Sequence, residues 1–168
     1  RHADPLRWLE REEIDQLPAA DRVILLSALR QLHTVDAELE AITAEIARHV
    51  AYEPGVRVLL SITGVGLVAA AAMWAYLGDP RRFRTAKQVT RYAGLDASVH
   101  QSGEQEWRGR ISRNGSKLLR TVVVEAAHSV ARHDLGPLGL FYRRKQRQIG
   151  RHKAVVALAR KLLIVAWR

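Results

Sequence analysis

The stretch "VRVLLSITGVGLVAAAAMWAYLGDPRRF" (residues 56–83) decides the fold that the sequence predicts. A short apolar segment leads into "TGVG", and an alanine-rich apolar segment follows it as far as "GDP". This order is typical of a helix-hairpin-helix motif, in which Gly64 and Gly66 permit a tight hairpin. The free N–H groups at the start of the second helix would then face a nucleic-acid phosphate.

The same stretch has a simpler interpretation, a glycine-pinched turn between two core helices, because a lone Gly-x-Gly is a weak signal. Its longest apolar run, "GVGLVAAAAMWAYLG" (64–78), is about 15 residues and too short for a membrane span. We therefore expect a buried helix there and no membrane partner. No signal peptide is visible.

Upstream, residues 19–50 carry a helical pattern with heptad spacing. Leu25, Leu32, Leu39 and Ile46 recur every seven residues, and Ala28, Val35, Ile42 and His49 follow three residues behind them. We predict a coiled coil through which the chain associates with itself, a helix packed on its own domain being the alternative. Dimer, tetramer and helix orientation stay open. "YEPG" (52–55) ends the helix, so the predicted domains are residues 1–55 and 56–168.

Charge divides the chain sharply around residue 80. Residues 1–80 hold 7 basic and 12 acidic side chains, a net of −5, and residues 81–168 hold 20 basic and 5 acidic ones, a net of +15. Such asymmetry favours a polyanionic partner, and arginine suits phosphate groups. The alternative is a compositional preference for arginine over lysine. The absence of cysteine excludes disulfides and thiolate metal sites.

The sequence of the basic half (residues 81–168) predicts helices that flank one short β-type insertion. A helix capped by Thr85 is expected first, and "ASVHQSG" and "EWRGRI" then predict a small two-stranded hairpin or loop. A helix over 117–133 should follow, with an apolar stripe of Leu118, Val122, Ala126 and Val130. "LGPLG" (135–139) predicts a turn, 140–150 is strongly basic, and 151–168 predicts a last amphipathic helix. The expected fold class is mainly α.

The residues expected to contact DNA lie mostly in this half. They are Gly64, Gly66, Arg81, Arg82, Arg84, Lys87, Arg108, Arg110, Arg113, Lys117 and Arg120. A solvated basic face is the alternative for the cations.

In the basic half, the side chains that could act as a catalytic nucleophile are hydroxyl groups. Its few carboxylates match no metal-binding spacing, and no phosphate-binding Gly-rich loop occurs. A serine that attacks a phosphodiester needs an exposed hydroxyl, removal of its proton and nearby cations. Ser102, Ser112 and Ser116 all lie near arginines, and their spacing leaves the choice open.

Three blocks of the chain together resemble a known family. They are "LLSITGVGLVAAAAMWAYLGDPRRFRTAKQVTRYAGLDASVHQSG", "GRISRNGSKLLRTVVVEAAH" and "HKAVVALARKLLIVAW". Over about residues 56–168 they resemble the C-terminal transposase domain of bridge-RNA-guided insertion-sequence recombinases, related to the pilin-gene invertases. The preceding helix is similar to that family's coiled-coil linker.

The resemblance implies a serine nucleophile that forms a phosphoserine link to DNA. The family's serine stands in an "SG" after the "YAGL" block, which corresponds to Ser102, and its hairpin glycines correspond to Gly64 and Gly66. This sequence departs from the family at Thr63, where proline is frequent, and at Gln101, where a second serine is frequent. The second departure loosens the alignment of the loop by about a residue.

The resemblance also implies partners outside this chain. Family members carry a RuvC-like N-terminal domain whose acidic residues bind Mg²⁺, so we expect this chain to be an excised piece that is inactive alone. Expected partners are DNA, a bridge RNA and further copies of the chain, in the bacterial cytoplasm at the nucleoid. The alternatives are a non-catalytic helix-hairpin-helix module that binds nucleic acid, and a coiled-coil assembly domain whose basic face is incidental.

Overall fold

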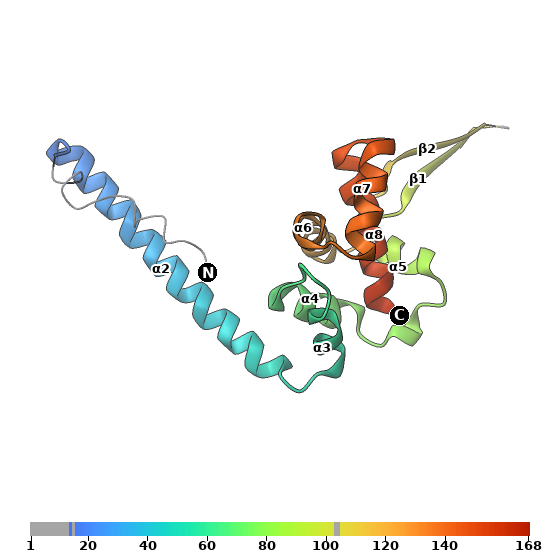
Figure 1. Ribbon diagram of the computed structural model, residues 1–168, viewed down its shortest axis with the longest axis horizontal. Helices are drawn as coiled ribbons and strands as arrows, with labels where there is room; N and C mark the ends of the chain where they lie inside the picture. The colour runs from blue at the N-terminus through green and yellow to red at the C-terminus, as the bar shows by residue number, and fades with distance from the viewer. Residues whose placement is uncertain (1–13, 15, 103–104) are drawn as a thin grey trace. The chain divides into compact units, whose positions relative to one another are not determined.

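The computed structural model describes residue 14, residues 16–102 and residues 105–168, with the backbone alone described over 98–102 and 105–110. Its contacts divide the chain into a unit that ends at Glu45 and a C-terminal unit that begins at Ile46. The elements, all labelled in Figure 1 except η1, are α2 (Ala19–Val50), α3 (Pro54–Leu60), α4 (Leu67–Leu77), η1 (Pro80–Arg82), α5 (Ala86–Tyr92), β1 (Ala97–Ser102), β2 (Gln105–Ile111), α6 (Lys117–His133), α7 (Pro137–Ile149) and α8 (Arg151–Trp167). The described chain is mainly helical with one two-stranded hairpin, which confirms the predicted fold class.

The long first helix confirms the predicted bounds, since α2 runs over 32 residues. At 1.5 Å per residue it is about 48 Å long. Its heptad positions stay open to solvent: Leu32, Val35, Leu39 and Ile42 are 38%, 51%, 56% and 57% exposed. Among the described residues of the unit that ends at Glu45, nothing therefore covers this apolar stretch of α2.

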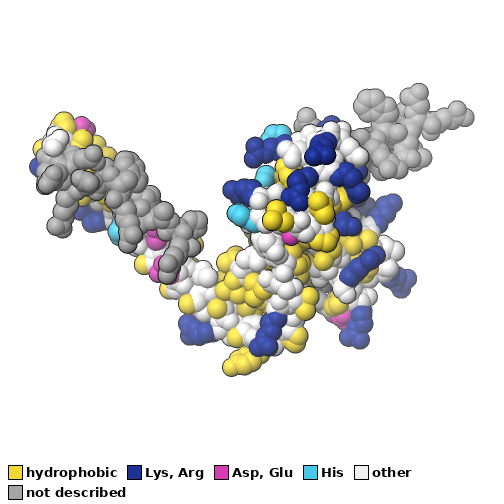
Figure 2. Space-filling model, viewed as in Figure 1, with side chains coloured by type: hydrophobic (Ala, Val, Ile, Leu, Met, Phe, Trp, Pro, Cys, Tyr) yellow, Lys and Arg dark blue, Asp and Glu magenta, His cyan; other side chains and the backbone are white. Residues whose placement is uncertain are grey.

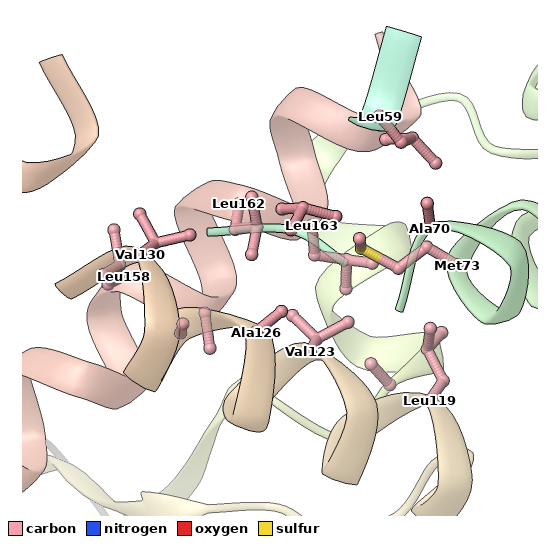
Figure 3. Close-up of a cluster of buried hydrophobic side chains, with 14 of the residues drawn as sticks. Leu59, Ala70, Met73, Leu119, Val123, Ala126, Val130, Leu158, Leu162 and Leu163 are labelled. Carbon is pink, nitrogen blue, oxygen red and sulfur yellow. The ribbon is translucent and has the colours of Figure 1, made fainter. Parts of the chain in front are cut away.

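The core of the C-terminal unit is built around α8. This helix packs against α4, α5, α6 and α7. Figure 3 shows the meeting of side chains from α3, α4, α6 and α8, among them Leu59, Met73, Val123, Leu158 and Leu162. Met73, Val123, Leu158 and Leu162 have no exposed surface. Each such side chain contributes about 1.5–3 kcal/mol by leaving water.

The apolar stripe predicted for the helix over 117–133 is wrong at its first residues, because a neighbouring row of side chains faces the core. Leu118 is 62% exposed and Leu119 is buried, so the buried face runs through the neighbouring residues. It comprises Leu119, Val123, Ala126, Ala127 and Val130. The helix has apolar pairs at 118–119 and 122–123, and periodicity alone does not say which member of a pair faces inward.

The predicted turn at 135–139 is also partly wrong, because α7 already begins at Pro137. Proline is favoured in the first turn of a helix, where its missing N–H needs no partner. The Asp134 carboxylate accepts a hydrogen bond from the Gly139 N–H at 2.6 Å, which gives this helix start an acceptor.

The hairpin between α3 and α4 places its two glycines in different surroundings. Gly64 has a φ of +92°, and a Cβ there would lie 2.7 Å from the Val130 nitrogen of α6. Gly66 is the N-cap of α4 with extended backbone, and a Cβ there would meet nothing within 4 Å. The close backbone approach at Gly64 is thus made to a helix of the same unit, while Gly66 faces open space.

We expect Gly64→Ala to destabilise the fold by about 2–4 kcal/mol, because it combines a strained backbone with an overlap against fixed backbone atoms. Gly66→Ala is the matched control and should cost less than about 1 kcal/mol, the loss of a preferred N-cap residue. Urea denaturation of both variants measures the difference. Equal stabilities would contradict the packing assigned to Gly64.

Candidate functional site

Two backbone segments cross at Gly94, just after α5, and Gly115, just before α6. A Cβ on Gly115 would overlap the Gly94 nitrogen and the Tyr92 carbonyl oxygen. Gly94 has a φ of +64°, and a Cβ there would lie 2.9 Å from the Arg113 carbonyl carbon. Only glycine allows two backbones to lie this close. We call this pair of glycines the glycine crossing.

Hydrogen bonds fasten the glycine crossing on both sides. The Ser116 backbone N–H donates to the Tyr92 carbonyl oxygen at 2.8 Å. The Ser112 backbone N–H donates to the Asp96 carbonyl oxygen at 2.8 Å, and the Arg113 backbone N–H donates to the Gly94 carbonyl oxygen at 3.2 Å. The end of α5, the base of the β-hairpin and the start of α6 are therefore held together. Neither glycine was predicted from the sequence to have a role, although they stand in the blocks "YAGL" and "RNGSK".

Arg120 lies inside this junction and completes it. Its Nη1 donates to the Ala93 oxygen at 3.0 Å and to the Arg113 oxygen at 3.4 Å. Arg113 itself adopts a φ of +57°, which is unusual for a residue other than glycine. The structure thus gives Arg120, predicted to contact DNA, a role within the fold, and its contact with DNA stays a prediction.

The β-hairpin carries Ser102 away from the crossing. β1 and β2 pair antiparallel, with Ser102 opposite Gln105 at the end of β1 and Val99 opposite Arg108. The register shifts by one residue between the pairs Ala97–Ile111 and Val99–Arg108, so β2 contains a bulge near Gly109. At about 3.3 Å per residue, the Ser102 backbone lies about 20 Å along the strand from Asp96.

The backbones of the predicted cations near Ser102 lie at different places along this hairpin, whose two strands are labelled in Figure 1. The backbones of Arg108 and Arg110 belong to β2, whereas Arg113 follows the strand and lies at the glycine crossing. The side chains of Ser102, Arg108 and Arg110 lie outside the described residues, so their roles stay predictions. Within this chain the hairpin does not bring Arg113 to Ser102.

The other two candidate serines have local partners. The Ser112 hydroxyl donates to Asp96 Oδ1 at 2.5 Å and accepts from the Asn114 N–H at 3.4 Å. The Ser116 hydroxyl accepts from the Leu119 N–H at 3.2 Å as the N-cap of α6. Both hydroxyls therefore stabilise the base of the hairpin and the start of the helix.

An open groove lies beside the glycine crossing, between α5 and the start of α6. It has a volume of about 400 Å³ and is lined by Arg82, Phe83, Gln88, Arg91, Tyr92, Asn114, Gly115 and Ser116. The Arg82 guanidinium lies 4.6 Å from the ring centroids of both Phe83 and Tyr92. Arg82 was predicted from the sequence to contact DNA. Nothing in the sequence pointed to its stacking on the rings of Phe83 and Tyr92.

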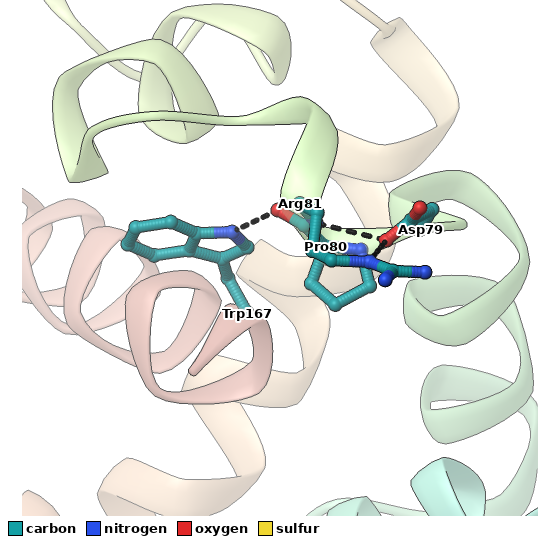
Figure 4. Close-up of polar contacts among 4 residues, drawn as sticks. All are labelled: Asp79, Pro80, Arg81 and Trp167. Carbon is teal, nitrogen blue, oxygen red and sulfur yellow. Dashed lines mark hydrogen bonds and ion pairs between the residues drawn. The ribbon is translucent and has the colours of Figure 1, made fainter.

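The neighbouring turn shows a different arrangement for Arg81. Its Nε lies 3.1 Å from Asp79 Oδ1, and both side chains are exposed. Hydrogen bonds from the Arg81 backbone N–H and then from its side chain lower the pKa of the Asp79 carboxyl. Trp167 fixes the turn by donating its indole N–H to the Pro80 oxygen at 2.8 Å (Figure 4). Arg84, Lys87 and Lys117 are exposed nearby.

A further group of cations lies at the corner between α7 and α8. It comprises Arg143, Arg144, Lys145, Arg147, Arg151 and Lys153, and the sequence signal for it is "RRKQRQIGRHK". Arg143 donates to the backbone oxygens of Asp134 and Leu135, while Arg144, Arg147, Arg151 and Lys153 are exposed. Figure 2 shows many Lys and Arg side chains and few acidic ones on this face of the C-terminal unit.

The described residues hold no group of three or more acidic, histidine or cysteine side chains that could bind a metal ion. A Mg²⁺ site therefore does not fit the residues that the structure describes. Across the same described residues, no helix has the length and apolar character needed to cross a bilayer.

The residues that form the β-hairpin, the glycine crossing and the start of α6 lie within a match to a known family. Residues 56–143 match the model of the transposase family IS116/IS110/IS902. The chain belongs to this transposase family. A probable family 20 transposase from Pseudomonas aeruginosa is 32% identical over 154 residues, which cover 90% of this chain and 46% of that protein.

Two other relatives are similar to this chain over part of their length. The transposase for insertion sequence element IS1111A of Coxiella burnetii is 32% identical, over 64% of this chain and 30% of that protein. The pilin gene-inverting protein of Moraxella lacunata is 29% identical, over 65% of this chain and 34% of that protein. The chain spans less than half the length of these relatives.

We expect Ser112→Ala to loosen the base of the hairpin in this transposase domain. The partly buried Asp96 carboxylate would lose a short hydrogen bond, and we expect a loss of about 1–2 kcal/mol. Hydrogen exchange at the β1 and β2 amides should accelerate. Ser61→Ala is the control, since its hydroxyl bonds only the exposed Val58 oxygen. Unchanged exchange in Ser112→Ala would show that the Ser112–Asp96 bond does not hold the hairpin.

Proposed function

We propose that this chain is the DNA-cleaving and DNA-joining part of a transposase, with Ser102 as its nucleophile. The observation that carries the choice of serine is the engagement of the other two candidates. Ser112 bonds Asp96 and Ser116 caps α6, whereas Ser102 is the last residue of β1 and pairs with Gln105 of β2. The family membership supports transposition of DNA as the overall process.

The proposed step is a transesterification. The Ser102 Oγ forms a bond to phosphorus while the bond from phosphorus to a deoxyribose oxygen breaks. The serine proton passes to solvent, and the released sugar oxygen takes a proton from solvent. Because the phosphoserine ester replaces the phosphodiester, a second sugar hydroxyl can reverse the reaction and join a new strand. Arginines of the hairpin would balance the charge that develops on the phosphate.

Mg²⁺ enters this proposal only as a requirement for residues beyond those described. The relatives are more than twice as long as the stretch that this chain matches. We propose that carboxylates of a RuvC-like domain supply the metal site, as the family resemblance implies. No step assigned to the described residues uses that metal.

The contacts proposed for this chain would not select the base sequence of the DNA target. Backbone N–H groups at the α3–α4 hairpin and arginines would contact phosphates, which carry no base sequence. Base pairing with a bridge RNA would supply the missing selectivity. A non-catalytic nucleic-acid-binding module is the second candidate, favoured by the exposed cations Arg144, Arg147, Arg151 and Lys153, which can contact phosphates without any chemistry.

The exposed heptad face of α2 supports self-association. Four apolar side chains at heptad spacing, Leu32, Val35, Leu39 and Ile42, are each more than a third exposed. A second α2 would bury this seam by knobs-into-holes packing. Shared sites between subunits could then form.

The nucleophile is tested with the form of the protein that the host cell makes, supplied with Mg²⁺, its RNA and nicked cognate DNA. Digestion and mass spectrometry of the covalent product should place the DNA on the peptide that contains Ser102. Ser102→Ala should lose the adduct and retain DNA binding. An adduct on Ser112 or Ser116 would support the serine mechanism but show that Ser102 is not the nucleophile. Recombination without any adduct would support the non-catalytic module.

Self-association is tested by sedimentation equilibrium of the 168-residue chain. Leu39→Asp places a charge in the seam and should weaken association at least tenfold, because an unpaired charge would be buried. Ala41→Asp is the matched control, since this residue is exposed and lies off the seam. A monomer in the unchanged chain, or equal loss in both variants, would contradict the coiled coil.

A further inference from the structure

The groove beside the glycine crossing has the dimensions of a small-ligand site. Its volume of about 400 Å³ falls within the range of about 300–1,000 Å³ typical of such sites. One wall comes from η1 and α5, and the other comes from the segment 114–116 that leads into α6. The groove is therefore assembled by the same backbone contact that fixes the hairpin.

The electrostatic character of the groove is positive throughout. Two arginines line it, Arg82 and Arg91, and no acidic side chain does. Asp79, the closest acidic neighbour of Arg82 in sequence, is engaged by Arg81. The start of α6, a helix of 17 residues, adds the positive end of its dipole on the side of Ser116.

Arg82 is oriented by its surroundings. Its guanidinium lies 4.6 Å from the centroids of Phe83 and Tyr92, whose rings are 5.4 Å apart and tilted by 55°. A guanidinium stacked on rings keeps its N–H edge directed outward. Among the described residues, the structure gives the Arg82 and Arg91 guanidinium groups no hydrogen-bond acceptor and no ion pair. Their donors are available for a ligand.

We propose that the groove binds one unpaired nucleotide of a nucleic-acid strand. Its phosphate accepts hydrogen bonds from Arg82 and Arg91, a geometry that a planar guanidinium suits. Its base stacks on the Arg82 plane and on the edge of Tyr92, as bases do on arginine and aromatic side chains in single-strand sites. A base inside a duplex is already stacked on both faces, so the base that lies against Arg82 must be unstacked and unpaired.

The inference rests on the proposed function only in that the chain handles nucleic acid. It does not depend on the identity of the nucleophile. All binding is therefore measured in a Ser102→Ala background, so that failure of the cleavage chemistry and failure of the groove are distinguishable.

Neighbouring arginines provide the matched pair of variants. Arg82→Ala and Arg81→Ala remove the same charge from adjacent exposed positions, but only Arg82 lines the groove. Fluorescence anisotropy with a single-stranded oligonucleotide should show binding about tenfold weaker for Arg82→Ala. The slope of log affinity against log salt should fall by about 0.7, the value for one phosphate contact on a single strand.

Arg81 is itself a predicted DNA contact, but its side chain is already paired with Asp79, so Arg81→Ala should weaken binding clearly less than Arg82→Ala does. Arg82→Lys should be intermediate, because it keeps the charge and loses the planar stack. Equal losses in Arg81→Ala and Arg82→Ala would overturn the proposal, since binding would then follow total charge. Thermal unfolding of each variant confirms that the fold is intact.

Photocrosslinking locates the base independently of the variants. An oligonucleotide that carries one 5-iodouracil should crosslink to the peptide that contains Tyr92, and pairing it with a complement should abolish that crosslink. Deoxyribose and ribose versions of the probe distinguish a DNA strand from an RNA as the source of the nucleotide. Crosslinks confined to the hairpin or to the corner between α7 and α8 would overturn the proposal.

Discussion

The contact between the backbones at Gly94 and Gly115 is the constraint on which the site depends. A single methyl group on Gly115 would overlap three backbone atoms, so the two segments can approach only because both residues lack side chains. Around this contact the fold places the groove, the base of the hairpin and the N-terminus of α6. A shift of a few tenths of an ångström at the crossing would move all of them together, because α6 is packed into a dense core.

The arginines around the crossing show how equal charges acquire different roles. Arg120 is held by two carbonyl oxygens, Arg81 is held by Asp79, and Arg82 is held by two aromatic rings. Carbonyl oxygens and a carboxylate use the donors of the guanidinium. Rings contact its face and leave the donors available. The surroundings, more than the net charge of the half-chain, therefore decide which arginine can meet a phosphate.

The sequence predicted the elements better than their faces and contacts. The long helix, the Thr85 cap and the bounds of the helix over 117–133 follow from periodicity and capping residues, and the structure confirms them. Which face of that helix points inward could not be predicted, because the adjacent apolar residues at 118–119 and 122–123 fit two different stripes equally well. The roles of Gly115 and Arg120 could not be predicted, since both depend on atoms of the segment around Gly94, more than 20 positions earlier in the chain.

The separation between the groove and Ser102 limits how one strand could use both. The strand β1 places the Ser102 backbone about 20 Å along the strand from Asp96, at the base of the hairpin. A nucleotide held in the groove is thus not the one that Ser102 would attack. The groove would hold an unpaired nucleotide at a distance from the reacting phosphate, while the hairpin would present the serine to another part of the same nucleic acid or to the DNA of a second subunit. The exposed heptad face of α2 offers a means of bringing that second subunit near, so assembly and chemistry would depend on different parts of one short chain.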